Sequence, residues 1–240
     1  MTSQIPEFIL KELNKIKIAR AILLTGSRAI GRESKNSDWD FMIILKNGSP
    51  RWRKTYRLNN EWIELLCNSK EQIEKEFLED LKEGKGTTTY MFATGFIVKD
   101  SNDKILKKLT SRARTNWNRG PKKLSKNEIG QINYKISTCI QDIEDCLYEN
   151  NHAALVVDDT IVQFVKYYYR LGNVWLIRPK ERLEDIKKMN PKIYNLIIGA
   201  EEAKDWRKKA KLVISMGKII GKKYQLNLSG EIFLPPQNKS

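Results

Sequence analysis

The 240-residue sequence has few cysteines and almost no histidine. Its three cysteines are Cys67, Cys139 and Cys146, and its single histidine is His152. Because the cysteine count is odd and no CxxC spacing occurs, we expect neither a disulfide framework nor a zinc site. The cysteines are then best interpreted as small buried side chains. With only one histidine, any general base is expected to be a carboxylate.

Long hydrophobic runs are also missing. No stretch approaches the roughly 20 uninterrupted apolar residues of a membrane-spanning helix, and residues 1–20 mix charged with apolar side chains and lack the apolar region of a signal peptide. We therefore expect a cytoplasmic protein without membrane contact. Apolar residues still make up 40% of the chain, which is enough for one large or two modest cores.

Acidic residues are outnumbered, because 44 Lys and Arg against 29 Asp and Glu give a net charge of +15. This charge suits nucleic acid, a triphosphate or an acidic partner. It could equally reflect a composition rich in Lys, Asn and Ile, as AT-rich coding tends to produce. One segment concentrates the positive charge: from Lys99 to Lys126 there are ten Lys or Arg residues, and the only acidic residues are Asp100 and Asp103. This segment is a candidate lining for an anionic site.

The first half of the chain alternates helical and strand patterns. Apolar residues at helical spacing predict helices over 5–18 and 70–83, and Ser69 with Gln72 resembles a capping box that opens the second one. Asn59-Asn60 suits the turn of a hairpin. The predicted strands are 21–26, 37–45, 53–58, 61–67 and 95–100, with a short helix from residue 27 and a helix over 103–113.

The second half is entirely helical in pattern. The composition changes near Arg119-Gly120-Pro121, after which no strand pattern follows for about a hundred residues. Ser125 and Glu128 form another capping box. An apolar stripe follows at Ile129, Ile132, Ile136, Ile140, Ile143 and Leu147, and further helices are predicted over 153–171, 180–189, 191–203 and 204–222. We therefore expect an α/β (α+β) protein with a small mixed sheet in residues 1–118, and a bundle of four or five helices in 119–240 that ends in an irregular tail.

Two aspartates stand where a buried strand begins, in the stretch LLTGSRAIGRESKNSDWDFMIIL over residues 23–45. On a strand, Asp38 and Asp40 project to one side while Trp39 and Phe41 project to the other. Two adjacent carboxylates repel each other unless a cation lies between them, and oxygen ligands of this kind suit Mg²⁺ bound with substrate phosphates. The pair therefore predicts a magnesium site.

A third ligand is available in the segment WIELL, residues 62–66. Glu64 is the one charged residue in this apolar strand, and Ile63 and Leu65 are expected on the core side. Glu64 would then face the site from a neighbouring strand. Three carboxylates could hold two metal ions about 4 Å apart, which activate an attacking oxygen and stabilise a leaving one.

The turn Gly26-Ser27 supplies the features of a phosphate site. Glycine lets the backbone approach a phosphate closely, Ser27 adds a hydroxyl donor, and the amides of a following helix favour an anion. Arg28 and Arg32 add positive charge nearby. The turn is not a Walker loop, because GxxxxGK[ST] is absent, and no GxGxxG occurs.

Together these residues resemble the DNA polymerase beta type nucleotidyltransferase superfamily. Its signature is an apolar-Gly-Ser turn, a spacer, an Asp-x-Asp strand and a later strand with one acidic residue, matched here by LLTGS, the ten residues RAIGRESKNS, DWDF and WIELL. The form GSRA…SDxDF is similar to the bacterial antibiotic nucleotidyltransferases. The helical half, particularly YYYRLGNVWLIRPKERLEDIKKMNP, is similar to the C-terminal domain of the kanamycin nucleotidyltransferase group.

The resemblance implies an activity and a set of site residues. Asp38, Asp40 and Glu64 would be catalytic and would bind two Mg²⁺, while Gly26, Ser27 and, as a plausible phosphate contact, Arg28 would bind the nucleotide. The reaction implied is attack of an acceptor hydroxyl on the α-phosphorus of an NTP, with AMP transfer from ATP expected and pyrophosphate released. Residues 1–118 would be the nucleotidyltransferase catalytic domain and 119–240 the C-terminal helical bundle domain, in a monomer or homodimer.

The acceptor stays open at the level of the sequence. An aminoglycoside-like small molecule is the first expectation; tRNA or a partner protein, as in toxin and antitoxin nucleotidyltransferases, is the alternative, and the basic segment with Trp117 favours RNA. A catalytically silent nucleotide-binding module is a third possibility. By resemblance to the kanamycin group, the general base would be a carboxylate of the helical half, with Asp142, Glu144, Asp145, Asp158 and Asp159 as candidates. Arg178, Lys180 and Arg182 are candidate triphosphate contacts.

Overall fold

The computed structural model describes residues 4–149 and 152–228, and its chain divides into two units, Met1–Pro121 and Lys122–Ser240. The first unit contains the sheet and the second contains only helices within its described residues. This arrangement confirms the expected fold class. The assignment of a catalytic and a helical domain, with a boundary after residue 118, stays a prediction.

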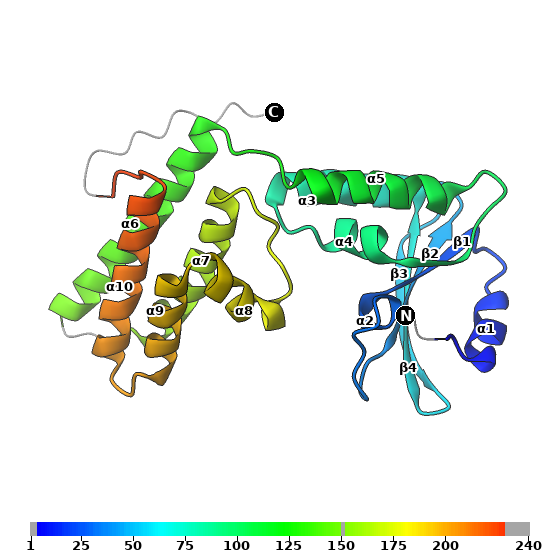
Figure 1. The fold of residues 1–240 in the computed structure, drawn as a ribbon, viewed down its shortest axis with the longest axis horizontal. Helices are drawn as coiled ribbons and strands as arrows, with labels where there is room; N and C mark the ends of the chain where they lie inside the picture. Colours follow the sequence, from blue (N-terminus) through cyan, green and yellow to red (C-terminus); the bar gives the residue numbers. More distant parts are fainter. Residues whose placement is uncertain (1–3, 150–151, 229–240) are drawn as a thin grey trace. The chain divides into compact units, whose positions relative to one another are not determined.

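The first unit is built on a five-stranded mixed sheet (Figure 1). Its strands are β1 (Ala21–Thr25), β2 (Trp39–Leu45), β3 (Trp52–Leu58), β4 (Glu61–Ser69) and β5 (Phe96–Lys99). They lie in the order β3-β4-β2-β1-β5, in which only the β2–β4 pair is parallel. The central strand β2 and its neighbour β1 are almost entirely buried, as continuous apolar runs predict.

The two faces of the sheet carry different cores, because side chains alternate along each strand. One face presents residues such as Ile22, Phe41 and Leu65 to Ile9 and Leu13 of α1 (Glu7–Asn14). The opposite face presents Leu23, Met42, Leu66 and their neighbours to three helices. These helices are α3 (Lys70–Glu83), α4 (Thr87–Thr94) and α5 (Ile105–Arg119).

Several local signals are confirmed. The Ser69 hydroxyl accepts a hydrogen bond from the Gln72 backbone while the Gln72 side chain bonds back to the Ser69 backbone, so the capping box is complete. Asn59 and Asn60 have φ values of +46° and +67°, the left-handed conformations that a tight hairpin requires and that asparagine tolerates. The helix α3 ends at Gly84, which was not among the predicted signals, with φ +75°.

Other boundaries differ from the sequence prediction. The helix predicted over 5–18 ends at Asn14, because the chain must turn before it enters β1, and Ile16 packs on the core from that turn. The helix predicted from residue 27 is the single turn α2 (Gly26–Ala29). The helix predicted over 103–113 continues to Arg119. The helix α4 is not predicted at all, since its start is a run of three threonines with low helix propensity.

The second unit is a bundle of five helices over its described residues. They are α6 (Lys126–Tyr148), α7 (Ala154–Leu171), α8 (Pro179–Met189), α9 (Pro191–Glu202) and α10 (Trp206–Lys223). The predicted capping boxes and caps are present: Ser125 pairs with Glu128, and the Asn190 side chain accepts from the Lys192 and Ile193 backbones.

The core of this bundle follows the predicted stripe of α6. Ile132, Ile136, Ile140 and Ile143 are buried, Leu147 packs partly against them, and Ile129 at the start of the helix is 36% exposed. The predicted irregular tail lies outside the described residues beyond Leu228. Among residues 4–149 and 152–228, none of the helices combines the length and hydrophobicity of a membrane-spanning segment.

Candidate active site

Three carboxylates from two neighbouring strands converge on one face of the sheet. Asp40 on β2 is paired in register with Glu64 on β4 and, on its other side, with Thr25 on β1. One carboxylate oxygen from each of Asp38, Asp40 and Glu64 lies within 4.8 Å of the others. Asp38 is exposed, whereas Asp40 and Glu64 are partly buried. We call these three residues the acidic triad.

The alternation of the strands sets the direction of the triad. Trp39, Phe41, Ile63 and Leu65 belong to the core on the opposite face, as the sequence pattern predicts, so Asp40 and Glu64 project to the face that is covered further along by α3, α4 and α5. The predicted strand over 37–45 begins only at Trp39. Asp38 therefore stands immediately before β2.

Gly26 lies directly against the triad. Its φ is +71°, and a Cβ built at this position would lie 2.0 Å from Oδ2 of Asp40. A side chain is thus excluded twice, by the backbone conformation and by the Asp40 carboxylate. The neighbouring Thr25 hydroxyl donates a hydrogen bond to the Asp40 carbonyl at 3.2 Å. The predicted phosphate turn and the predicted metal ligands are therefore adjacent in space.

The turn is followed by a much shorter helix than the sequence suggests. Because α2 is only four residues long, a helix dipole contributes little here. Phosphate binding would depend on the backbone of the Gly26-Ser27 turn and on the Ser27 hydroxyl. Arg32 is exposed, and its backbone N–H donates to the Ser27 carbonyl at 2.9 Å.

Arg28 is engaged in a network that holds the segment before β2. Its Nη2 donates to the Ser37 carbonyl at 2.7 Å and to the Glu61 carboxylate at 2.8 Å, and its Nε donates to the Asp38 carbonyl at 3.2 Å. The guanidinium also lies 4.3 Å from the centroid of the Trp39 ring. These contacts fix the backbone that carries Asp38. A phosphate contact by Arg28 stays a prediction.

Two residues near the triad, Glu61 and Thr25, were not predicted from the sequence, because strand register brings them there. Glu61 accepts hydrogen bonds from both Arg28 and Nε1 of Trp39, the latter at 3.1 Å, and Thr25 braces Asp40. Neither residue belongs to a sequence motif. The one feature of the sequence that could have indicated them is their position at the end of a predicted strand, Thr25 near the end of β1 and Glu61 at the start of β4.

The five candidate general bases lie on α6 and α7 of the second unit, and three of them have structural partners there. Glu144 pairs with Lys218 at 3.2 Å, Asp158 pairs with Lys209, and Asp159 accepts from Gln163. Arg178 likewise pairs with Glu181, and Arg182 donates to the Ile177 carbonyl at 2.8 Å. Their catalytic roles, with those of Asp142, Asp145 and Lys180, stay predictions.

The donor set of the triad fits a hard divalent cation. It offers carboxylate oxygens only, from a partly exposed position, and oxygen ligands are those that Mg²⁺ prefers. No other group of three His, Cys, Asp or Glu residues meets the same distance among residues 4–149 and 152–228. The arrangement can therefore bind a metal ion beside a turn suited to phosphate.

Comparisons with known proteins show which family and which solved structure this chain resembles. The family model described as "Nucleotidyltransferase domain" matches residues 7–141, which is more than half of the chain. No curated protein sequence matches the chain. A crystal structure of a nucleotidyltransferase-like protein from Exiguobacterium sibiricum 255-15 is similar, with a TM-score of 0.52 and 14% identity over 91% of this chain and 76% of that one. At this identity the structural likeness concerns the fold.

Proposed function

The chain belongs to the nucleotidyltransferase domain family and is a nucleotidyltransferase, and we propose that it transfers a nucleoside monophosphate from an NTP, with ATP preferred, to an acceptor hydroxyl in a Mg²⁺-dependent reaction. The observation that carries this proposal is the convergence of three carboxylates within 4.8 Å of one another beside the Gly26 turn. Residues 1–118 would be the catalytic domain, and 119–240 the helical domain.

Each site residue has a role in this proposal. Asp38, Asp40 and Glu64 would hold two Mg²⁺ ions. Bound Mg²⁺ would orient the triphosphate and neutralise charge that develops on its oxygens. Gly26 and Ser27 would bind the outer phosphates through backbone N–H groups and the Ser27 hydroxyl. Arg28 would act mainly by positioning Asp38, with the phosphate contact as its alternative role.

The reaction balances without a further reactant. The acceptor oxygen forms a bond to the α-phosphorus as the bond from this phosphorus to the bridging oxygen breaks. The products are the nucleotidylated acceptor and pyrophosphate, and the hydroxyl proton passes to a carboxylate base or to water.

The first acceptor that we propose is a small molecule of the aminoglycoside type, on the strength of the sequence resemblance. ATP labelled at the α-phosphate, incubated with Mg²⁺ and either aminoglycosides, lincosamides, total tRNA or cell extract, should label one of these acceptors, whereas ATP labelled at the γ-phosphate should not. Asp38→Ala and Asp40→Ala should abolish the transfer. Label transfer that survives both substitutions would contradict the proposal.

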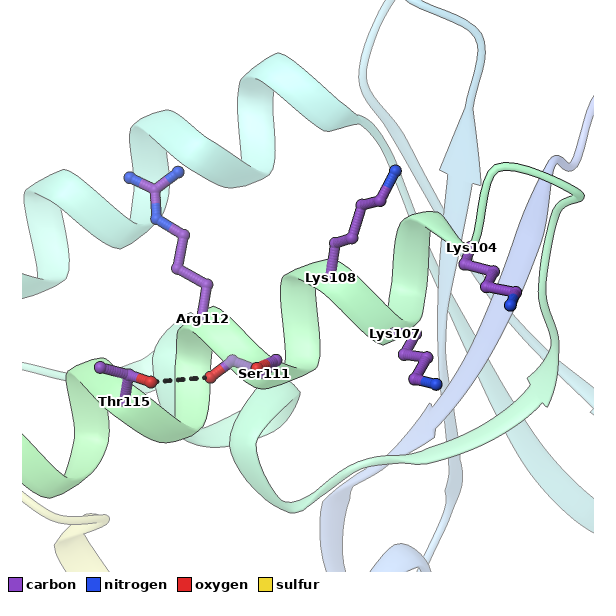
Figure 2. Close-up of a pocket in the computed structure, with 6 residues that line it drawn as sticks. All are labelled: Lys104, Lys107, Lys108, Ser111, Arg112 and Thr115. Carbon is purple, nitrogen blue, oxygen red and sulfur yellow. Dashed lines mark hydrogen bonds between the residues drawn. The ribbon is translucent and has the colours of Figure 1, made fainter.

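RNA is the second candidate acceptor, and a basic face of α5 favours it. An open hollow of about 570 Å³ is lined by Lys104, Lys107, Lys108, Ser111, Arg112 and Thr115 (Figure 2). Arg112 also reaches Glu74 of α3 at 3.3 Å, but in the described part of the chain the three lysines form no ion pair. Four cations and two hydroxyls on one helix face suit a phosphate backbone.

The start of α5 is also electrostatically unfavourable without such a partner. Its first turn contains no acidic residue, Lys107 and Lys108 lie close to the positive end of the helix dipole, and Lys104 has a left-handed φ of +54°. The Asp100 carboxylate compensates in part by accepting from the Leu106 and Lys107 backbones. If RNA binds this face, affinity for total tRNA should fall steeply with salt, and Lys107→Gln with Lys108→Gln should reduce the salt slope. Affinity without salt dependence would exclude this candidate.

A further inference from the structure

The edge of the sheet beside the acidic triad carries three large side chains on the triad's own face. Trp62 stands two residues before Glu64 on β4, so the two project to the same side. On β3, Thr55 pairs with Glu64, Arg57 pairs with Trp62, and Arg53 pairs with Leu66. By this register Arg53, Thr55 and Arg57 share that face as well.

These side chains are accessible. Trp62 is 50% exposed, although a tryptophan normally buries most of its surface. The guanidinium of Arg57 lies 6.0 Å from the centroid of the Trp62 ring. Arg53 and Arg57 are exposed, and neither forms an ion pair within residues 4–149 and 152–228. The result is an open aromatic side chain with Arg57 beside it and with Arg53 four residues further along the same strand face.

The order of the strands assigns this surface to the acceptor. Across the sheet, the proposed phosphate turn follows β1, the triad lies at β2 and β4, and β3 comes next, on the side of β4 away from β2. In a phosphoryl transfer the attacking and leaving oxygens are roughly in line on opposite sides of the phosphorus. If pyrophosphate leaves toward Gly26-Ser27, the attacking hydroxyl enters from the β4–β3 side, where Trp62 stands.

We propose that Trp62, Arg53 and Arg57 form an acceptor platform, on which the base of a terminal RNA nucleotide stacks while the two arginines hold the adjoining phosphates. This inference rests on the proposed function, because it uses the direction of the transfer. A flat apolar ring with one cation beside it and a second further along the same face matches a nucleobase joined to successive phosphates. Aminoglycosides carry several positive charges, and the two arginines would repel them. The platform thus favours the second candidate acceptor, RNA, over the small molecule that the sequence resemblance places first.

Fluorescence anisotropy with two matched probes tests the platform. One probe is a fluorescein-labelled single-stranded oligoadenylate, and the other is an abasic strand of the same length and charge. The wild-type protein should prefer the strand that carries bases. Trp62→Ala should bind oligoadenylate about 5- to 150-fold more weakly and lose the preference, as expected for the loss of one base stack. Trp62→Phe should retain most of it.

Charge variants separate stacking from electrostatics. Arg57→Gln, on the platform, and the pair Lys107→Gln and Lys108→Gln, on α5, should weaken the binding of both probes while the preference for bases persists. Circular dichroism should show an unchanged fold for Trp62→Ala, since half of that side chain is exposed.

Three results would overturn the platform. Wild-type protein that binds both probes equally, or binds neither, contradicts base stacking. A Trp62→Ala protein that keeps the wild-type preference contradicts the role of Trp62. A separate measurement, made without either probe, tests the proposed function. It would be contradicted if the wild-type protein showed no Mg²⁺-dependent ATP binding.

Discussion

Gly26 is the residue at which the proposed phosphate turn meets the proposed metal ligand Asp40. In Gly26→Ala, the new Cβ would meet Oδ2 of Asp40 at 2.0 Å, so the carboxylate must move. Because a displacement of about 1 Å at a reacting centre can reduce activity about 100-fold, we expect a loss of at least that size. The transfer of α-labelled phosphate measures it.

Gly48 offers a matched control for this substitution. Its φ is +78°, close to that of Gly26, but a Cβ there would meet nothing within 4 Å. Both alanine variants should lose about 1–2 kcal/mol of unfolding free energy from the left-handed backbone. Only Gly26→Ala should lose activity. Equal activities in the two variants would show that the contact with Asp40 does not matter.

Cys67 is a second residue whose surroundings determine its chemistry. It is 0% exposed, and burial raises the pKa of its thiol to about 12. At pH 8 only about one such thiol in 10,000 is ionised, and the thiolate is the reactive form. We expect the variant Cys139→Ser with Cys146→Ser, which retains Cys67 alone, to show no reaction with Ellman's reagent until guanidinium unfolds it. Rapid reaction of the native variant would contradict this burial.

The residues of the candidate site differ in how visible they are in the sequence. Gly26, Asp38 and Asp40 stand close together along the chain, in a spacing that chemistry explains. Glu64 is visible because a charge interrupts an apolar strand. Thr25, Glu61 and Trp62 acquire their positions only from the pairing of β1, β2 and β4, which no local pattern specifies.

Among the elements, α4 depends on a side chain from another helix. Its N-cap is Gly86, which provides no capping side chain. The carboxylate of Asp80, on α3, instead accepts from the backbones of Thr87 at 3.1 Å and Thr89 at 2.7 Å. Asp80 is only 8% exposed. Asp80→Ala would leave these donors unpaired, and we expect a loss of about 1–3 kcal/mol of unfolding free energy in chemical denaturation.

Glu79, the exposed neighbour of Asp80 on α3, provides the control substitution. Glu79 pairs with Lys75 at 3.9 Å on the surface, and such pairs contribute roughly 0.3–0.5 kcal/mol. Glu79→Ala should therefore be almost neutral. If the two variants unfold at the same denaturant concentration, Asp80 does not stabilise α4.

The contrast between α3 and α4 also explains which elements the sequence could predict. The helix α3 has its own cap, apolar spacing and terminal glycine, so local residues determine it. The helix α4 is held by Asp80 and by Phe92 in the core, which are tertiary interactions. Similarly, the end of α1 follows from the turn into β1 and has no stop signal in the sequence.

At the scale of the whole molecule, the chain concentrates its candidate chemistry in one unit. The triad, the proposed phosphate turn, the proposed acceptor platform and the basic face of α5 all lie within Met1–Pro121. The other unit, Lys122–Ser240, has a continuous helical core over its described residues. The architecture was predictable because strand and helical patterns are segregated along the chain. The acceptor was not, because its recognition depends on which side chains the folded sheet brings to one face.

The central claim is that the acidic triad binds a nucleotide through Mg²⁺. Calorimetric titration of a non-hydrolysable ATP analogue tests it without any acceptor. We expect binding in the presence of Mg²⁺, and at least about 10-fold weaker binding in EDTA or in Asp40→Asn, with Glu79→Gln unchanged as the control. Affinity that is the same with and without Mg²⁺, or the same in Asp40→Asn as in the wild-type protein, would contradict the account.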